Sequence, residues 1–281
     1  MRNQFTIKEE KVLAGIGLHS GKEVTMRIKP APENSGIVFI RVDLPGRPCI
    51  PAQVVNVSDT RRATTLGWET AKVHTAEHLL AALSAQGIDN LYIEMDSAEP
   101  PVVDGSSLPF IKLLEAAGVI EQQAVRSVIK ITEPIWVRQG DRYLVALPYE
   151  GFRVSCLFIN PHPLIGTQYG DFEINGENFC KEISPARTIG FMHEVEALQA
   201  QGLALGGSPD NAIVYDHDTV LTPLRFEDEV VRHKILDIIG DLALLGPIQA
   251  HIIAAKSSHA LNTELARCIY ERNFQVNKEA L

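Results

Sequence analysis

Two short segments, far apart in the chain, contain side chains that commonly bind metal ions. The first is Thr75-Ala76-Glu77-His78, and the second is His233-Lys234-Ile235-Leu236-Asp237. Both lie in stretches that are predicted to be helical, and together they offer two imidazoles and one carboxylate as ligands. Three protein ligands with one open coordination position are typical of a catalytic zinc site rather than a structural one. Such a site makes water an available nucleophile near neutral pH.

The second segment belongs to a predicted helix with one polar stripe. His233, Asp237 and Asp241 recur every four residues, which places them on one side of the helix. The opposite side is apolar and consists of Val231, Ile235, Ile238, Ile239, Leu242 and Leu245. Polar stripes of this kind are often simply solvated. Apart from Arg232 and Lys234, however, the stripe lacks the Lys, Arg and Glu mixture of a solvent-facing surface, so a ligand role stays open.

The first segment allows two different ligand sets. His74, Glu77 and His78 match the H-x-x-E-H motif of inverted zinc peptidases, in which both histidines bind the metal. In the alternative, only His78 binds the metal, and the other ligands come from His233 and Asp237. Glu77 has the same role in both sets, because it accepts a proton from water. The motif by itself does not decide between them.

A third histidine follows a predicted strand of the second half. His259 lies in the polar segment Ser257-Ser258-His259-Ala260-Leu261-Asn262. Functional sites are often built where polar residues follow a buried strand, although a histidine in a surface loop would have the same pattern. If a hydrogen-bond network joins His259 to Asp241, the negative charge favours the imidazolium form. His259 could then protonate an amine leaving group while Glu77 serves as the base.

Two further segments contain polar groups that could contact a substrate. Ser184-Pro185-Ala186-Arg187-Thr188-Ile189-Gly190-Phe191 includes a hydroxyl at Thr188 that could donate to an oxyanion, or simply cap a turn. Gly206-Gly207-Ser208 does not match G-x-G-x-x-G, so we exclude a dinucleotide site. The sequence also has no Walker motif and no G-x-S-x-G motif.

Composition excludes several classes of function. The chain has 281 residues, 45% of them hydrophobic and 22% charged, as in a folded globular protein. Lys and Arg total 26 against 35 Asp and Glu, and the net charge of −9 argues against general nucleic-acid binding. Local cations could still bind a small anionic substrate.

Cysteine usage and the start of the chain predict the compartment. The four cysteines, Cys49, Cys156, Cys180 and Cys268, form no C-x-x-C pair and indicate buried or inert thiols in a reducing cytosol. The charged first residues and the absence of a long apolar run predict a cytoplasmic protein without an integral membrane segment.

The order of predicted elements occurs twice. The first set comprises strands at 11–18, 23–30 and 36–41, a helix at 74–86, a strand at 91–96 and a helix at 107–117. The second set comprises strands at 128–132, 135–139, 142–147 and 153–159, a helix at 227–245, a strand at 248–256 and a helix at 263–273. We interpret the repeat as a diverged internal duplication with α+β layers, because strands precede helices in each half. Residues 190–220 interrupt the second set and are a candidate substrate wall or lid.

Several short segments, in order along the chain, resemble one enzyme family. They are Gly15-Ile16-Gly17-Leu18-His19-Ser20-Gly21, Thr75-Ala76-Glu77-His78-Leu79-Leu80-Ala81-Ala82-Leu83, Asp104-Gly105-Ser106, Ala186-Arg187-Thr188, Gly206-Gly207-Ser208, His233-Lys234-x-x-Asp237 and Ser258-His259. This ordered set is similar to that of the UDP-3-O-acyl-N-acetylglucosamine deacetylases, the zinc enzymes that commit Gram-negative bacteria to lipid A synthesis. The resemblance extends over nearly the whole chain.

The resemblance implies two similar domains, each a mostly antiparallel β-sheet layered with two helices, with the active site at their interface. We expect domains at 1–124, with a small β insertion near 51–68, and at 125–281, with an insertion near 190–220. The second insertion would form the hydrophobic passage for a fatty acyl chain. Its apolar residues suit that role: Phe191, Val195, Leu198, Leu203, Leu205, Ile213 and Val214.

The resemblance also implies a role for each residue of the site. The Zn²⁺ ligands would be His78, His233 and Asp237. Glu77 matches the general base, and His259 matches the general acid, which Asp241 orients. Thr188 matches the donor to the oxyanion. His74 matches no position of the family's site. The implied reaction is zinc-dependent hydrolysis of the N-acetyl group of UDP-3-O-acyl-N-acetylglucosamine, which gives UDP-3-O-acyl-glucosamine and acetate.

Substrate contacts follow from the same resemblance. Lys234 and His19 match positions that meet the polar head of the nucleotide sugar, and Ile189, Phe191 and Gly207 would contact the rest of the substrate. Ile189 departs from the family, because many members have an aromatic residue there. A monomer without a fused dehydratase domain is expected. The alternatives are a zinc peptidase and a protein that binds acyl chains or nucleotide sugars without catalysis.

Overall fold

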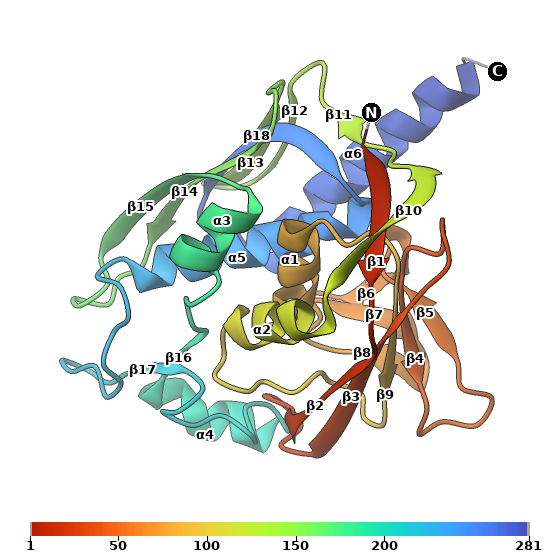
Figure 1. Cartoon of the computed structure of the whole chain (residues 1–281). Helices are drawn as coiled ribbons and strands as arrows, with labels where there is room; N and C mark the ends of the chain where they lie inside the picture. The colour runs from red at the N-terminus through yellow and green to blue at the C-terminus, as the bar shows by residue number, and fades with distance from the viewer. Residues whose placement is uncertain (1, 280–281) are drawn as a thin grey trace.

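Two β-sheets with the same internal arrangement form the framework of the protein (Figure 1). The structure is a computed structural model that describes residues 2–279, with side chains described as far as residue 273. The first sheet has the order β2 (Lys11–Ile16), β3 (Glu23–Pro30), β9 (Leu91–Met95), β4 (Ile37–Arg41) and β5 (Cys49–Pro51). The second has the order β12 (Ile135–Gln139), β13 (Arg142–Leu147), β18 (Ile248–Ala255), β14 (Phe152–Ile159) and β15 (Thr167–Glu173), with β11 (Ile129–Lys130) beside β18. Most neighbouring strands are antiparallel, which confirms the predicted α+β class.

The central strand has equivalent neighbours in the two sheets. β9 pairs antiparallel with β3 and parallel with β4, and β18 pairs antiparallel with β13 and parallel with β14. Helices flank the two central strands in the same order: α1 (Glu77–Gln86) and α2 (Leu108–Ala117) around β9, α5 (Glu229–Leu242) and α6 (His259–Glu279) around β18. This correspondence supports an internal duplication, and we propose a boundary between the halves near residue 124. Residues 280 and 281, at the end of the expected second domain, lie outside the described residues.

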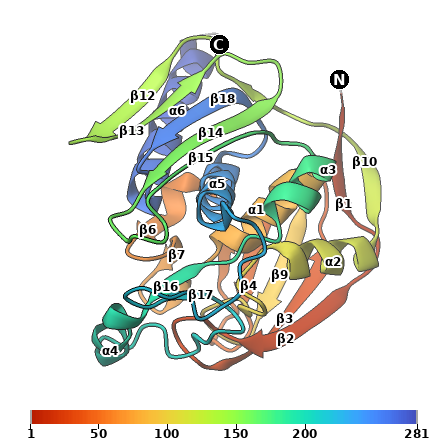
Figure 2. The same cartoon turned by 90° about the vertical axis from the view of Figure 1, so that its left-hand side faces the viewer.

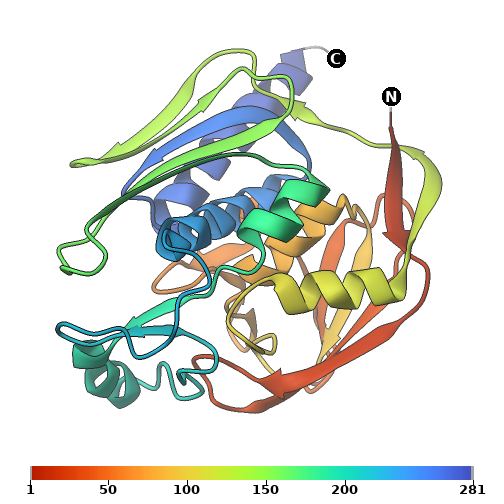
Figure 3. The same cartoon turned by 60° about the vertical axis from the view of Figure 1, so that its left-hand side comes forward.

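Alternating side chains orient both sheets toward a shared interior. In β3, Val24, Met26 and Ile28 are buried, with the two-residue period of a strand that has one solvated face. Ile135 and Val137 of β12 face inward in the same way. The helices lie between the sheets, α5 and α6 against the second and α1 and α2 nearer the first (Figure 3). One hydrophobic core therefore includes residues of both halves.

Helices α1 and α5 pack directly against each other at the centre of the molecule (Figure 3). α1 ends at Gly87, whose φ of 69° gives the C-terminal cap that the sequence predicts. In α5, the polar stripe of His233, Asp237 and Asp241 is as buried as the apolar side. The stripe is therefore not a solvated face. α5 continues into a short 3-10 helix, η3 (Ala243–Leu245).

Several elements differ from the sequence prediction. α1 begins at Glu77 rather than at residue 74, because Thr75 has a left-handed φ of 52° that a helix cannot contain. α6 begins at His259, four residues before the predicted start. An antiparallel pair of strands, β1 (Asn3–Ile7) and β10 (Val119–Val125), was not predicted. Their many polar residues lack the apolar alternation that marks a strand.

Each half contains an insertion outside its main sheet (Figure 2). In the first half, the insertion predicted near 51–68 extends to residue 73 and forms η1 (Val54–Asn56) and the three-stranded sheet of β6 (Val57–Asp59), β7 (Thr65–Trp68) and β8 (Ala71–Val73). In the second half, β16 (Ile189–Phe191) and β17 (Ile213–Tyr215) pair in parallel and are linked through α4 (Met192–Ala200). Among residues 2–279, no helix is both long and apolar enough to cross a membrane.

Candidate active site

The two predicted segments meet where α1 packs against α5. His78 is the second residue of α1, and its Nε2 lies 3.8 Å from Oδ1 of Asp237 on α5. Nε2 of His233, one turn earlier on α5, lies 3.4 Å from the same oxygen. One ligand atom from each of the three residues lies within 4.8 Å of the others, and all three side chains are buried. These residues, which we call the His-His-Asp cluster, could hold one metal ion.

The protonation states of the cluster suit a metal. Burial lowers the pKa of His78 to about 3 and also lowers the pKa of His233, so both rings are neutral, as a metal requires. Nδ1 of His233 lies 3.1 Å from the carbonyl oxygen of Ala186, which leaves Nε2 available to bind a metal. Oδ1 of Asp237 is buried and has no hydrogen-bond partner among the described residues. An orphaned carboxylate oxygen between two neutral imidazoles fits a divalent cation.

Lys234 contributes positive charge to the cluster. Its Nζ donates a hydrogen bond of 2.7 Å to Oδ2 of Asp237. Burial opposes ionisation of Asp237, but Lys234 and the neighbouring histidines together outweigh it and hold the pKa of that carboxyl well below its usual range. Burial likewise works to lower the pKa of Lys234, and the attraction of Asp237 raises it instead. The two groups therefore stay ionised together.

His74 does not belong to the cluster. Because the left-handed residue Thr75 separates His74 from α1, His74 and His78 do not share a helix face. Nδ1 of His74 lies 3.0 Å from the hydroxyl of Thr65. The ligand set with both histidines of the H-x-x-E-H motif is therefore disfavoured.

Glu77 lies beside the cluster and is almost fully buried. Its Oε2 accepts a hydrogen bond of 3.0 Å from the backbone N–H of Thr64. Its Oε1 lies 3.9 Å from Nε2 of His259. Burial raises the pKa of Glu77 to about 8, helped by the nearby carboxylates of Asp241 and Asp237. The Glu77 carboxylate therefore has a higher proton affinity than that of an ordinary glutamate.

His259 and Asp241 form a pair beside Glu77 and the cluster. Nδ1 of His259 lies 2.9 Å from Oδ2 of Asp241, which also accepts a hydrogen bond of 2.8 Å from the side-chain amide of Asn262. Burial alone would lower the pKa of His259, but the carboxylates of Asp241 and Glu77 outweigh it and raise the pKa to about 10. His259 is therefore a charged proton donor.

Thr188 lies on the segment that leads from the cluster to the insertion. Two residues before it, Ala186 contacts His233. The backbone N–H of Thr188 donates to the carbonyl of Gly105, and its carbonyl accepts from Ile213, so the segment bridges the halves. Arg187, which directly precedes Thr188, also holds this segment in place, because its guanidinium pairs with the buried carboxylate of Glu229.

His19 connects the first half with the insertion. Its Nδ1 accepts a hydrogen bond of 3.3 Å from the N–H of Ala204, and burial lowers its pKa. The backbone N–H of His19 donates to the buried carboxylate of Glu99, which also accepts from the hydroxyls of Ser20 and Thr75. Glu99 thus ties the His19 loop to the start of α1.

The insertion contains a small hydrophobic cluster of its own. Ile189 and Phe191 of β16 pack against buried residues that include Ile213 and Tyr215. Around it, large apolar side chains are exposed to solvent: Met192, Leu205, Leu221 and Leu224. No residue of α4 is fully buried, and Gly207 is exposed. The insertion therefore exposes apolar side chains to solvent.

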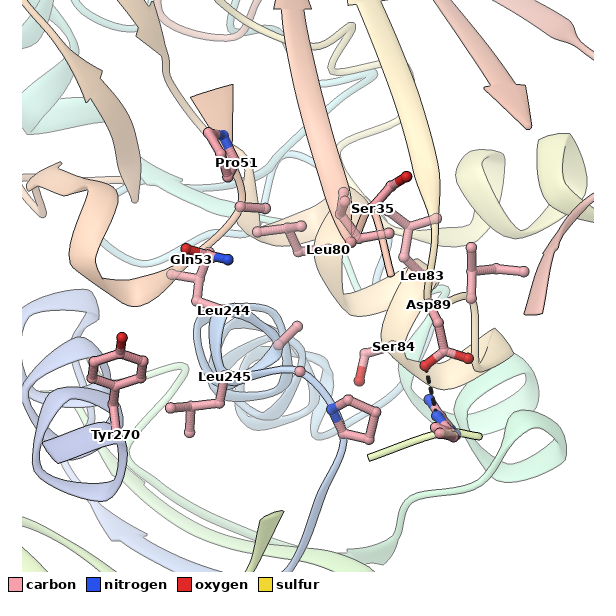
Figure 4. A pocket seen from close by; sticks show the side chains of 18 residues that line it. Ser35, Pro51, Gln53, Leu80, Leu83, Ser84, Asp89, Leu244, Leu245 and Tyr270 are labelled. Atoms are coloured by element: carbon pink, nitrogen blue, oxygen red, sulfur yellow. Dashed lines mark hydrogen bonds and ion pairs between the residues drawn. The ribbon is translucent and has the colours of Figure 1, made fainter. Parts of the chain in front are cut away.

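A separate cavity of about 240 Å³ lies between the halves (Figure 4). It is lined by the C-terminal part of α1, with Leu80, Leu83 and Ser84, and by Leu244 and Leu245 after α5. None of the predicted site residues lines it. The chemistry described above is therefore not located in this cavity.

Sequence reasoning missed Thr64, Glu99 and Ala186, which contact the predicted residues. Thr64 and Glu99 belong to no motif, and Ala186, which lies in the segment Ala186-Arg187-Thr188, contacts His233 through its backbone carbonyl. The structure does bring Glu77, His78, His233, Asp237, Asp241 and His259 together. All four cysteines are free: Cys156 is buried, Cys180 and Cys268 are partly buried, and Cys49 is exposed.

Known proteins resemble the chain over most of its length. A family model described as LpxC, UDP-3-O-acyl N-acetylglycosamine deacetylase, matches residues 4–271. The UDP-3-O-acyl-N-acetylglucosamine deacetylase of Myxococcus xanthus is 48% identical over 268 residues, which cover 94% of this chain and 85% of the relative. The protein of the same name from Syntrophotalea carbinolica is 46% identical over 269 residues, with 95% and 87% covered. That from Bdellovibrio bacteriovorus is 44% identical over 271 residues, with 95% and 90% covered.

Proposed function

Because the chain belongs to the family of UDP-3-O-acyl-N-acetylglucosamine deacetylases, it is a deacetylase of lipid A biosynthesis, and we propose that His78, His233 and Asp237 hold its Zn²⁺. The reaction hydrolyses the N-acetyl group of UDP-3-O-acyl-N-acetylglucosamine to give UDP-3-O-acyl-glucosamine and acetate. One observation carries the proposal. Nε2 of His259 lies 3.9 Å from both Oε1 of Glu77 and Oδ2 of Asp237, so a proton acceptor and a proton donor adjoin the His-His-Asp cluster.

The metal would supply Lewis acidity, which activates water and polarises a carbonyl group. The Lys234 ammonium would help to balance the charge of the site, because it pairs with Oδ2 of Asp237. Oδ1 of Asp237, which has no hydrogen-bond partner among the described residues, would then be free to bind the metal. The carbonyl of Ala186 would hold the His233 ring in its ligand orientation. These contacts prepare the site before the substrate binds.

We assign Glu77 the role of general base. The Thr64 N–H engages Oε2, which leaves Oε1 to accept the proton of the attacking water. The raised pKa of Glu77, about 8, gives its carboxylate enough proton affinity to retain that proton during the attack. The reaction needs both properties, because water must lose a proton as it adds to the acetamide carbon.

We assign His259 the role of general acid. Since Asp241 accepts the Nδ1 proton, the second ring proton lies on Nε2, which faces Glu77. A pKa of about 10 keeps both ring nitrogens protonated at neutral pH. His259 then donates the Nε2 proton to the departing glucosamine nitrogen, because an amine leaves far more readily once it is protonated. Asp241 stabilises the imidazolium and fixes its orientation.

Thr188, Lys234 and His19 are proposed to contact the substrate. The Thr188 hydroxyl would donate to the oxyanion of the tetrahedral intermediate. Lys234 and His19 would bind the polar head of the nucleotide sugar. Ala186, two residues before Thr188, contacts His233, and His19 contacts Ala204 of the insertion; these contacts support the assignments of Thr188 and His19.

The acyl chain is proposed to lie along the insertion. Ile189 and Phe191 would line the start of this passage, with Gly207 at its edge. The exposed apolar side chains around β16 and β17 support this, since a bound alkyl chain would remove them from water. Ile189 offers an aliphatic surface at the mouth of the passage.

The rival functions have less support. A peptidase that uses His74 and His78 requires His74 in the cluster, from which it is absent. A binding protein would have no need for Glu77 and the His259–Asp241 pair beside the cluster. The monomeric state and the cytoplasmic location stay predictions, which light scattering and cell fractionation would test.

A metal titration with an acetate-release assay tests the proposal. Metal-depleted protein is expected to release no acetate from UDP-3-O-acyl-N-acetylglucosamine, and one equivalent of Zn²⁺ should restore release. Peptide hydrolysis without acetate release would favour the peptidase. Substrate binding without any turnover at any metal concentration would favour the binding protein.

A further inference from the structure

Thr64 contacts both proton-transfer groups of the site, and no sequence motif marks it. Its backbone N–H donates to Oε2 of Glu77, and its hydroxyl donates to Oδ1 of Asp241. We propose that Thr64 is a positioning residue that orients His259 through Asp241. The inference rests on the proposed function, because it assigns Thr64 a part in the proton donation by His259.

Thr64 is built into the junction of three elements. Its side chain is fully buried, and it directly precedes β7 of the small three-stranded sheet. Its carbonyl oxygen accepts a hydrogen bond of 3.3 Å from the N–H of Ala76, immediately before α1. Its hydroxyl contacts α5 through Asp241 and lies 3.4 Å from Nδ1 of His259, the first residue of α6. Such a residue has little freedom to move.

The hydrogen bonds of Asp241 explain why the Thr64 hydroxyl matters. Asp241 is fully buried, so each of its oxygens needs donors. His259 and Asn262 donate hydrogen bonds to Oδ2, whereas the Thr64 hydroxyl donates to Oδ1. Without the Thr64 hydroxyl, Oδ1 would be an unpaired buried oxygen, and the carboxylate would gain by rotating toward other donors. Rotation would misalign Oδ2 and the imidazole that it holds.

The consequence for the reaction is specific to its chemical step. Nε2 of His259 must reach the departing nitrogen, and small errors in the position of a catalytic group reduce the rate strongly. Among the described residues, the hydrogen-bonding partners of the Thr64 hydroxyl are Asp241 and His259, neither of which belongs to the His-His-Asp cluster or the insertion. Loss of the hydroxyl should therefore lower kcat, while KM and metal content stay unchanged. If Thr64 served only the fold, loss of its hydroxyl would lower the stability of the protein and leave kcat of the folded fraction unchanged.

Thr64→Val tests the proposal, because valine keeps the shape of threonine without the hydroxyl. In the metal-loaded enzyme we expect kcat to fall about tenfold with KM and bound metal unchanged, and Thr64→Ser to recover most of the loss. Thr65→Val is the matched control. Thr65 is also buried, but its hydroxyl contacts His74 rather than Asp241, so kcat should be near wild type. If Thr64→Val does not fold, Thr64→Ala replaces it.

A double variant that combines Thr64→Val with His259→Ala tests whether Thr64 affects kcat through His259. If Thr64 acts through His259, Thr64→Val should cause no further loss of kcat once His259 is absent. The Nδ1–H resonance of His259, recorded on ¹⁵N-histidine-labelled protein, should shift in Thr64→Val and stay in place in Thr65→Val. A wild-type kcat in Thr64→Val, no recovery in Thr64→Ser, or an equal further loss in the His259→Ala background would overturn the inference. Wild-type turnover by His259→Ala alone would instead refute the proposed acid.

Discussion

Gly240 and Glu77 are in backbone contact: a Cβ atom added at residue 240 would lie 2.1 Å from the Glu77 carbonyl oxygen. α5 and α1 therefore approach each other directly at the residue next to His78. We expect Gly240→Ala to separate the helices and to destabilise the protein by roughly 1–3 kcal/mol, the usual cost of overpacking. Metal affinity should fall as well, because His78 and Asp237 lie on different helices. Thermal unfolding and a metal titration measure the two effects.

Gly176→Ala is the control for that substitution. Its added Cβ would lie 3.6 Å from the carbonyl oxygen of Ala85, an ordinary contact, and within 4 Å of no residue of the cluster. Its unfolding temperature and metal affinity should match those of the wild type. A Gly240→Ala protein as stable and as metal-avid as the wild type would show that the close helix contact is not required.

The ligand set predicts different metal contents for two histidine variants. His233→Ala removes one of the three ligands and should reduce bound zinc to a small fraction of an equivalent. His74→Ala lies outside the cluster and should retain a full equivalent. Elemental analysis of the dialysed proteins gives the result. The opposite pattern would support the peptidase-like ligand set.

The proton-transfer roles predict loss of activity without loss of metal. Glu77→Ala and His259→Ala should each lower kcat by about a hundred- to ten-thousandfold, the usual contribution of a general base or acid. Neither residue is a ligand in the cluster, so both variants should bind zinc. Steady-state kinetics on metal-loaded protein checks this. Normal turnover in either variant would remove that residue from the mechanism.

Much of the site could be predicted from the sequence because spacing places its residues. His233, Asp237 and Asp241 share one helix side through their four-residue period, whatever the rest of the fold does. Their convergence with His78 depends on packing between α1 and α5, which no periodicity encodes. There the resemblance to a known family provided the expectation, and the structure brings the three side chains together.

The remaining features depend on long-range contacts that leave no local pattern. Thr64 and Glu99 are single polar residues whose partners lie in other elements. The start of α1 was predicted too early because the left-handed φ of Thr75 is set by its surroundings, including its hydrogen bond to Glu99. In the same way, β10 is a strand because β1 pairs with it, although its residues are mostly polar.

The proposed passage predicts a selective effect of Phe191. Phe191→Ala removes apolar surface that would contact the acyl chain, which is worth about 1.5–3 kcal/mol when fully buried. KM for the long-acyl substrate should therefore rise tenfold or more, with little change for an analogue that carries a short acyl group. Trp136→Ala is the control, since Trp136 is 65% exposed on the second sheet, away from the insertion. Equal losses for both substrates in Phe191→Ala would contradict the passage.

Anomalous diffraction at the zinc edge, on crystals of the metal-loaded protein, tests the central claim most directly. The account predicts one ion bound by Nε2 of His78, Nε2 of His233 and the Asp237 carboxylate, with Glu77 and His259 beside it but not ligating. An ion bound by His74, or an ion that contacts only one of the two helices α1 and α5, would contradict it.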